Sequence, residues 1–128
     1  MIVVDTSIWI EFFRGRNSTV NNHLCRLIDQ DQVLLAAPVR LEILMGAARR
    51  EVPTLRRVLS ALPLLVPGDA TWSKLESWVD RARKAGERFG AMDLLIAGIA
   101  DDHGASIWSM DDDFARMARL HFTRLFQV

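Results

Sequence analysis

The sequence predicts an α/β fold with a central, mainly parallel sheet of four to five strands and helices on both faces. Short apolar runs rich in branched residues alternate with longer segments of helical periodicity, which is the pattern of βαβ units. The apolar runs show no polar alternation, as expected of strands covered on both faces. A chain of 128 residues is long enough for one core and too short for two. A single domain spanning residues 1–128 is therefore expected.

Three strands and four helices are expected in the first half of the chain. The strand candidates are Ile2–Val4, Val33–Ala36 and Leu64–Val66. Helices are expected after Ser7, from near Ser18, from Val39 to about Ala48 and from Pro53. Proline suits a first helical turn, since its missing N–H would lack a helical partner there. On the helix that Pro53 opens, three apolar residues are expected to face inward: Leu55, Val58 and Leu59.

The second half continues the alternation. A long helix capped by Asp69 or Thr71 is expected to end near Gly86, with an apolar series at Trp72, Leu75, Val79 and Ala82. Another helix runs from about Ala91 toward Gly104, and a fourth strand follows at Ser106–Ser109. The aspartates at 111–113 begin a last helix, and Phe122–Val128 is expected as a short edge strand.

Composition narrows the class of protein without naming a partner. Sixteen basic and sixteen acidic residues cancel, which excludes binding of polyanions by bulk charge alone. The lone Cys25 excludes an intramolecular disulfide framework and is expected as a small core residue. No apolar run reaches the ~18 residues of a membrane span, and the amino terminus lacks the basic region of a secretory signal. A cytoplasmic protein without membrane contact is expected.

Four carboxylates are expected to converge at the carboxyl edge of the sheet. Asp5 ends the first strand and Asp111 follows the fourth, at the edge where open α/β folds place their sites. Asp93 lies near the start of its helix. Helix capping or the helix dipole would explain any one of these three aspartates. Glu42 is the one acid of an apolar helical segment, where an unpartnered buried carboxylate costs several kcal/mol.

A hard divalent cation accounts for the four acids together. Converging carboxylates repel one another and take up protons unless a cation is present. Mg²⁺ takes oxygen ligands and needs neither His nor Cys. When bound, it makes an attacking water more acidic and neutralises charge on a phosphodiester. The chemistry indicated is metal-assisted hydrolysis of phosphodiester bonds.

Four segments carry a further signal through their order and spacing: Met1–Ile10, the Glu42 helix, Asp93–Ala97 and Ser109–Phe114. Together they resemble PIN-domain ribonucleases, and more closely the VapC toxins of type II toxin–antitoxin pairs. The likeness extends from Met1 to Phe126. It rests on four motifs in order, since no single one is decisive.

The resemblance implies a fold, an acidic site and a cofactor. The fold is the α/β/α sandwich of the PIN domain. Asp5, Glu42, Asp93 and Asp111 correspond to the acidic quartet that binds Mg²⁺, or Mn²⁺ in its place, and supports catalysis. Thr6 and Ser109 correspond to supporting hydroxyls, although many relatives have Thr at the latter position. Asp113 corresponds to an additional acid seen in many members, and Asp112 is left solvated.

The resemblance also implies an activity and partners. Such toxins are endoribonucleases that arrest growth by cutting RNA; they form homodimers and larger complexes with a VapB-type antitoxin. The antitoxin fills a groove beside the active site, often with a basic side chain in the acidic pocket. Contacts with RNA phosphates are expected from Arg40, Arg49, Arg50 and Arg81, and a wider set adds Arg56, Arg57, Arg83 and Arg88. An ordinary solvated surface is the open alternative. The four tryptophans pack in the core or a dimer interface, or else stack on bases.

Two other classes of phosphoryl-transfer enzyme fit poorly. Haloacid-dehalogenase-like phosphatases require a second aspartate where this chain has Ser7, and receiver domains require a lysine at a late strand end, whereas Lys74 and Lys84 fall on one helix. The remaining alternative is a catalytically inactive PIN-like module that binds RNA or a partner. The presence of all four acids argues against it.

Overall fold

Four short parallel strands form the centre of the computed structural model, which describes all 128 residues. They are β1 (Ile2–Val4), β2 (Val33–Ala36), β3 (Leu64–Leu65) and β4 (Ser106–Trp108), in the spatial order β3-β2-β1-β4. Val3 pairs with Leu34 on one side and with Ile107 on the other. All pairings are parallel, which confirms the predicted α/β class.

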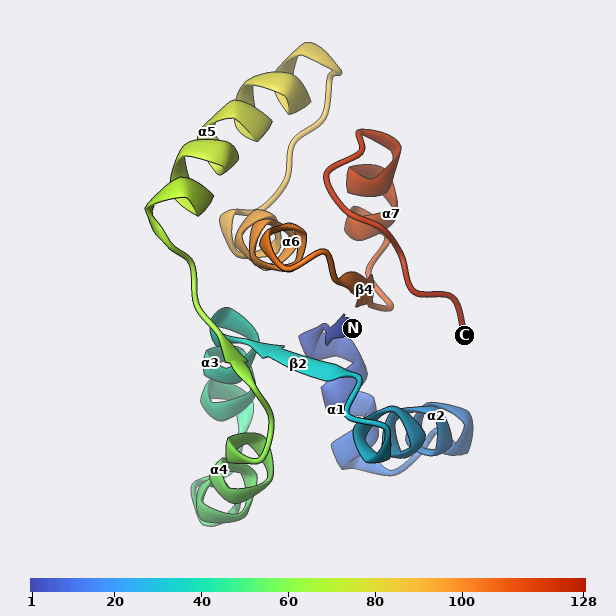
Figure 1. Cartoon of the computed structure of the whole chain (residues 1–128). Helices are drawn as coiled ribbons and strands as arrows, with labels where there is room; N and C mark the ends of the chain where they lie inside the picture. The colour runs from blue at the N-terminus through green and yellow to red at the C-terminus, as the bar shows by residue number, and fades with distance from the viewer.

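Seven α-helices flank the sheet. They are α1 (Thr6–Arg14), α2 (Ser18–Asp29), α3 (Ala37–Gly46), α4 (Val52–Ser60), α5 (Asp69–Lys84), α6 (Ala91–Asp102) and α7 (Asp112–Arg119), with a 3-10 turn at Arg49–Glu51. Helices α1 to α4 lie on one side of the strands and α5 to α7 on the other (Figure 1). Right-handed crossovers explain this division, because the chain moves outward from β1 to β3 and then returns past β1 to β4.

The strand order reverses next to β1, and this reversal positions the acidic residues. The chain leaves β1 toward β2 and later adds β4 on the opposite edge of β1. Open α/β sheets bind ligands outside the carboxyl ends of the strands at such a point. Asp5 directly follows β1, and Asp111 precedes α7 as its N-cap residue.

Branched and aromatic side chains fill the space between the sheet and the helices. Val3, Val4, Leu35 and Ile107 are fully buried, as the continuous apolar runs predicted. Helices α5 and α6 meet at Gly98, where a Cβ atom would lie 2.7 Å from Cδ2 of Leu75. The absence of a side chain at this position therefore allows the two helices to approach closely.

Some predicted inward positions were wrong. On α5 the buried residues are Thr71, Leu75, Trp78 and Ala82, whereas Trp72 is 52 % and Val79 38 % exposed. Thr71 is tolerated inside because its hydroxyl accepts a hydrogen bond from the Gly68 N–H and donates one to Asp102. Val58 of α4 is also largely exposed. Cys25 lies on the exposed side of α2 rather than in the core.

The two predicted outer strands are shorter than expected. β3 contains only Leu64 and Leu65, and the neighbouring Val66 is 60 % exposed because β3 pairs on one edge alone. The carboxyl-terminal strand is reduced to an isolated parallel bridge between Ile107 and Leu125. Three tryptophans, at positions 9, 78 and 108, are buried and serve packing. None of the helices is both long enough and apolar enough to cross a membrane.

Candidate metal site

Asp5 is the buried member of the acidic site, with 6 % of its surface exposed. Its Oδ2 atom accepts hydrogen bonds from Ser7 Oγ at 2.9 Å and from Ser109 Oγ at 2.7 Å, while Oδ1 has no hydrogen-bond partner. Asp5 is the N-cap residue of α1, but its side chain caps no backbone N–H. Helix capping therefore does not explain this carboxylate.

The two serine hydroxyls fix the loop after β4 against the start of α1. Each donates its proton to Asp5 and accepts a backbone N–H in turn. The Met110 N–H donates to Ser7 Oγ at 3.0 Å, and the Asp111 N–H donates to Ser109 Oγ at 2.9 Å. A hydroxyl has a single proton, so each serine that donates to Asp5 has none left for another acceptor, and the two hydroxyl oxygens lie 3.3 Å apart. The family resemblance implies a supporting role for Ser109, whereas sequence reasoning gave Ser7 no part in the site.

Glu42 projects from the middle of α3 and is half-buried. Its Oε1 atom accepts a hydrogen bond from Thr6 Oγ1 at 2.9 Å, and its Oε2 atom has no partner. A neutral hydroxyl thus orients the carboxylate without cancelling its charge. Thr6 is the residue to which the family resemblance gives a supporting role, which stays a prediction.

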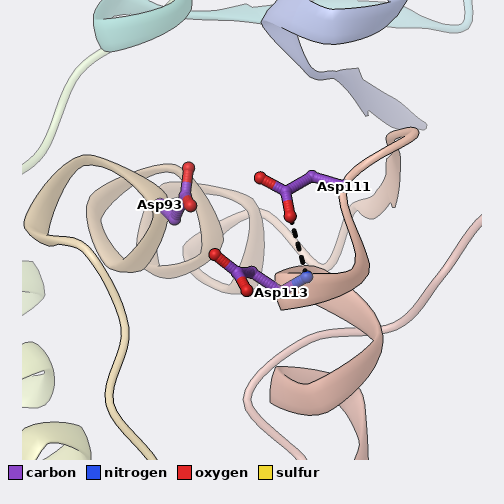
Figure 2. Close-up of side chains that lie close together, drawn as sticks. All are labelled: Asp93, Asp111 and Asp113. Atoms are coloured by element: carbon purple, nitrogen blue, oxygen red, sulfur yellow. Dashed lines mark hydrogen bonds between the residues drawn. The ribbon is translucent and has the colours of Figure 1, made fainter.

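Asp93, Asp111 and Asp113 form the tightest group. One carboxylate oxygen from each lies within 4.8 Å of the other two, a spacing that suits ligands of one metal ion. Figure 2 shows these side chains converging from the first turn of α6 and the start of α7. Asp111 caps α7, because its Oδ1 accepts a hydrogen bond from the Asp113 N–H at 2.9 Å. Asp93 accepts no hydrogen bond, so neither of its oxygens is committed.

Electrostatics connect this group to the other two acids. Burial is the main cause that raises the pKa of Asp93 from 3.8 to about 6, and the negative charges of four further carboxylates raise it more. In decreasing order of effect, these carboxylates belong to Asp111, Asp5, Asp113 and Glu42. The charges of Asp5 and Glu42 therefore act on Asp93 together with those of Asp111 and Asp113.

Arg116 is a neighbour of the site that sequence reasoning missed. Its guanidinium donates hydrogen bonds to the carboxylates of Asp113 and Glu87 and lies 4.7 Å from the centre of the Phe89 ring. The i,i+3 spacing of Asp113 and Arg116 on α7 was the available sequence signal. Of the five acids, Asp113 is the one paired with a cation.

The arginines predicted to contact phosphates lie in different surroundings. Arg81 donates a hydrogen bond to the Leu120 carbonyl at 2.7 Å, and its guanidinium lies 4.8 Å from the centre of the Phe122 ring. Arg49 and Arg50 are exposed on the 3-10 turn, and Arg40 is half-buried on α3. Phosphate contacts by these four side chains stay predictions.

The five carboxylates fit a hard divalent cation by their chemistry. Asp5, Glu42, Asp111 and Asp113 each have one oxygen held by a donor and one without a hydrogen-bond partner, and both oxygens of Asp93 are without one. The held oxygens orient the groups and the others are available as ligands. An all-oxygen set suits Mg²⁺ or Mn²⁺ and disfavours zinc, which prefers nitrogen and sulfur.

Comparisons with known sequences find relatives over almost the whole chain. The family profile described as "PIN domain" matches residues 2–120. VapC ribonuclease Mb1587 of Mycobacterium bovis is 37 % identical over 125 residues, which cover 94 % of this chain and 93 % of the relative. Ribonuclease VapC11 of Mycobacterium tuberculosis matches with the same identity and the same coverage.

Solved structures share the fold at lower identity. A chain of VapBC2 from Rickettsia felis, bound to a promoter DNA fragment, superposes with a TM-score of 0.81 at 18 % identity and covers 98 % of both chains. VapC20 of Mycobacterium tuberculosis, described as a sarcin-ricin loop cleaving toxin, gives a TM-score of 0.65 at 16 % identity, with 91 % of this chain and 95 % of that chain covered. At these identities the likeness shows the fold alone.

Proposed function

The chain belongs to the PIN-domain family and, within it, to the VapC ribonucleases, and from this membership we propose that it is a toxin that hydrolyses RNA phosphodiester bonds at its acidic site. The proposed cofactor is Mg²⁺, with Mn²⁺ as a substitute. One observation carries the proposal: the carboxylates of Asp93, Asp111 and Asp113 lie within 4.8 Å of one another, and the charges of Asp5 and Glu42 act on the same Asp93. Each of the five keeps at least one oxygen free of hydrogen bonds.

The proposed roles follow from how each side chain is held. Asp5, Glu42, Asp93 and Asp111 would hold the cation and act as the catalytic acids, and Thr6, Ser7 and Ser109 would orient them. Asp113, paired with Arg116, would complete the site from its outer side. A cation bound there would make an attacking water more acidic and neutralise charge on the scissile phosphate. The serine hydroxyls keep the charge of Asp5 intact, because a neutral donor orients a carboxylate without pairing it.

A cleavage assay tests this assignment. Purified protein is expected to cut RNA with Mg²⁺ or Mn²⁺ and to lose the activity on addition of EDTA. Asp5→Asn and Asp93→Asn should each remove it, whereas Asp112→Asn is the matched control, since Asp112 is exposed at the start of α7 and lies outside the cluster. RNA binding without cleavage under every metal would instead indicate an inactive PIN-like module. Unchanged cleavage by either site variant would show that the acidic residues are assigned wrongly.

We also propose a VapB-type antitoxin as partner. The first support is that the solved neighbours are described as toxin–antitoxin complexes, among them the VapBC2 complex. The second is a groove of about 220 Å³ between α1, α3 and α4, which reaches Glu42 at the acidic site. Its wall includes Ile10 and Phe13, which are 41 % and 38 % exposed. An amphipathic segment with a basic residue at one end would match this groove.

The remaining proposals concern assembly and location. We propose one PIN domain over residues 1–128, a homodimer, a hetero-oligomer with the antitoxin, and a cytoplasmic location where RNA is available. Light scattering of the purified chain, alone and co-expressed with the protein of the adjacent reading frame, tests the assembly. A monomer under both conditions would refute it.

A further inference from the structure

A pocket of about 340 Å³ lies beside the acidic site, between the end of α5, the following loop and the start of α6. We call it the Arg88 pocket. Its lining is half apolar, and its residues are Val79, Ala82, Arg83, Gly86, Glu87, Arg88, Phe89 and Leu94. None of these residues belongs to the proposed metal site.

Two connections join the Arg88 pocket to the acidic site. Leu94 in the pocket wall directly follows Asp93 on α6. On the other side, the Arg116 guanidinium bonds both Asp113 and Glu87, and donates to the Arg88 carbonyl at 3.5 Å. A ligand in the pocket would therefore lie next to whatever occupies the acidic site.

The pocket presents uncompensated positive charge. Glu87 is its one acidic residue, and Arg116 pairs with that carboxylate. Arg88 is exposed and has no carboxylate within 4.0 Å. Arg83 contacts Asp80 only at 3.8 Å, with both side chains more than 70 % exposed, and such a pair contributes little. Two guanidinium groups are thus available to an anion.

We propose that the Arg88 pocket binds the RNA chain next to the phosphodiester at the acidic site, with Arg83 and Arg88 contacting its phosphates. This inference rests on the proposed function, since it takes RNA as the substrate. The acidic site repels RNA phosphates, so cations nearby are needed to hold the strand. Guanidinium groups suit phosphate oxygens because they offer paired N–H donors. The apolar part of the lining, with Phe89 and Leu94, offers a surface for a ribose or base.

Binding measured in EDTA separates the pocket from cleavage. The probe is a fluorescently labelled single-stranded RNA, and anisotropy is followed from 50 to 300 mM salt. The variant is Arg83→Ala with Arg88→Ala. The matched control is Arg16→Ala with Arg26→Ala, two exposed arginines before and on α2, which lies on the other side of the sheet (Figure 1). Unchanged melting temperatures verify folding.

The pocket variant is expected to bind RNA more weakly. Its plot of log K against log salt should be less steep than that of wild type by roughly 1.4, or about 0.7 for each lost phosphate contact. The control should keep the slope, and Arg88→Lys should restore part of the binding. Equal losses in the pocket variant and the control, or no loss in either, would overturn the proposal. If the pocket variant lost affinity for poly-glutamate as much as for RNA, the pocket would be assigned to an acidic peptide and the proposal would also be overturned. Cleavage of RNA by the wild-type protein with Mg²⁺ is measured in a separate assay. RNA binding without cleavage would contradict the ribonuclease function and would leave the proposal for the pocket standing.

Discussion

Replacement of Asp93 by asparagine is expected to stabilise the metal-free protein at neutral pH. In the folded protein, burial and four neighbouring carboxylates raise the pKa of Asp93 from 3.8 to about 6. An acid with a raised pKa binds its proton more tightly folded than unfolded. The free energy of unfolding therefore falls as the pH rises through the interval between these two values, and the penalty is complete above pH 6. Asparagine removes the charge and with it the penalty.

The structure bounds the size of this effect. A rise in the pKa from 3.8 to about 6 lowers the free energy of unfolding by roughly 3 kcal/mol, since each pH unit corresponds to about 1.4 kcal/mol. Asp93 is half-buried and Asp111 is exposed, so solvent screening reduces the expected gain to about 1–2 kcal/mol. For a chain of this length, that is an increase in the melting temperature of roughly 3–8 °C.

Thermal unfolding in EDTA at pH 4 and pH 7.5 is the assay. Asp93→Asn should melt above wild type at pH 7.5 and close to it at pH 4, where the wild-type carboxyl is largely protonated. Asp112→Asn, the exposed neighbour outside the cluster, should change little at either pH. Addition of Mg²⁺ should raise the melting temperature of wild type more than that of Asp93→Asn. The electrostatic account of the site would be refuted if the melting temperature of Asp93→Asn were at or below that of wild type at pH 7.5. It would also be refuted if the variant exceeded wild type by the same amount at both pH values.

Further predictions concern the supports of the site and the helix packing. Ser109→Ala should lower the free energy of unfolding by about 1–3 kcal/mol, because buried Asp5 loses a donor; urea denaturation measures this, and unchanged stability would contradict the hydrogen-bond network. Gly98→Ala should lower the free energy of unfolding by about 1–3 kcal/mol, since the added Cβ would lie 2.7 Å from Leu75. Gly46→Ala is the control for that change, as nothing lies within 4 Å of the added atom, and equal losses in the two glycine variants would exclude packing as the cause.

Local pattern predicted most of the fold because its parallel strands are continuous apolar runs and its helices carry clear start and stop signals. Errors arose where tertiary contacts override amphipathic periodicity. On α5 the buried face contains polar Thr71, which bonds Asp102 across to α6, and leaves Trp72 exposed. No pattern within α5 alone reveals that partner. The same reason applies to Leu64 and Val66, whose exposure follows from the edge position of β3.

The candidate acids could be singled out in the sequence because charged residues beside apolar runs are conspicuous, while the side chains that hold them are less so. Family resemblance alone predicts supporting roles for Thr6 and Ser109, and sequence reasoning gives Ser7 no part in the site. No sequence motif singles out Arg116. Its role depends on Glu87, which is 29 residues away in the sequence and adjacent in space.

The nature of each support distinguishes the acids from one another. Hydroxyl and backbone N–H donors hold Asp5, Glu42 and Asp111 and leave their charges unpaired, and Asp93 has no donor at all. Asp113 instead forms an ion pair with Arg116. A cation gains most from carboxylates whose charge is not already paired, since an arginine partner must be displaced or shared. We therefore expect the four unpaired acids to account for most of the cation affinity, and Asp113→Asn to weaken Mg²⁺ binding less than Asp93→Asn does.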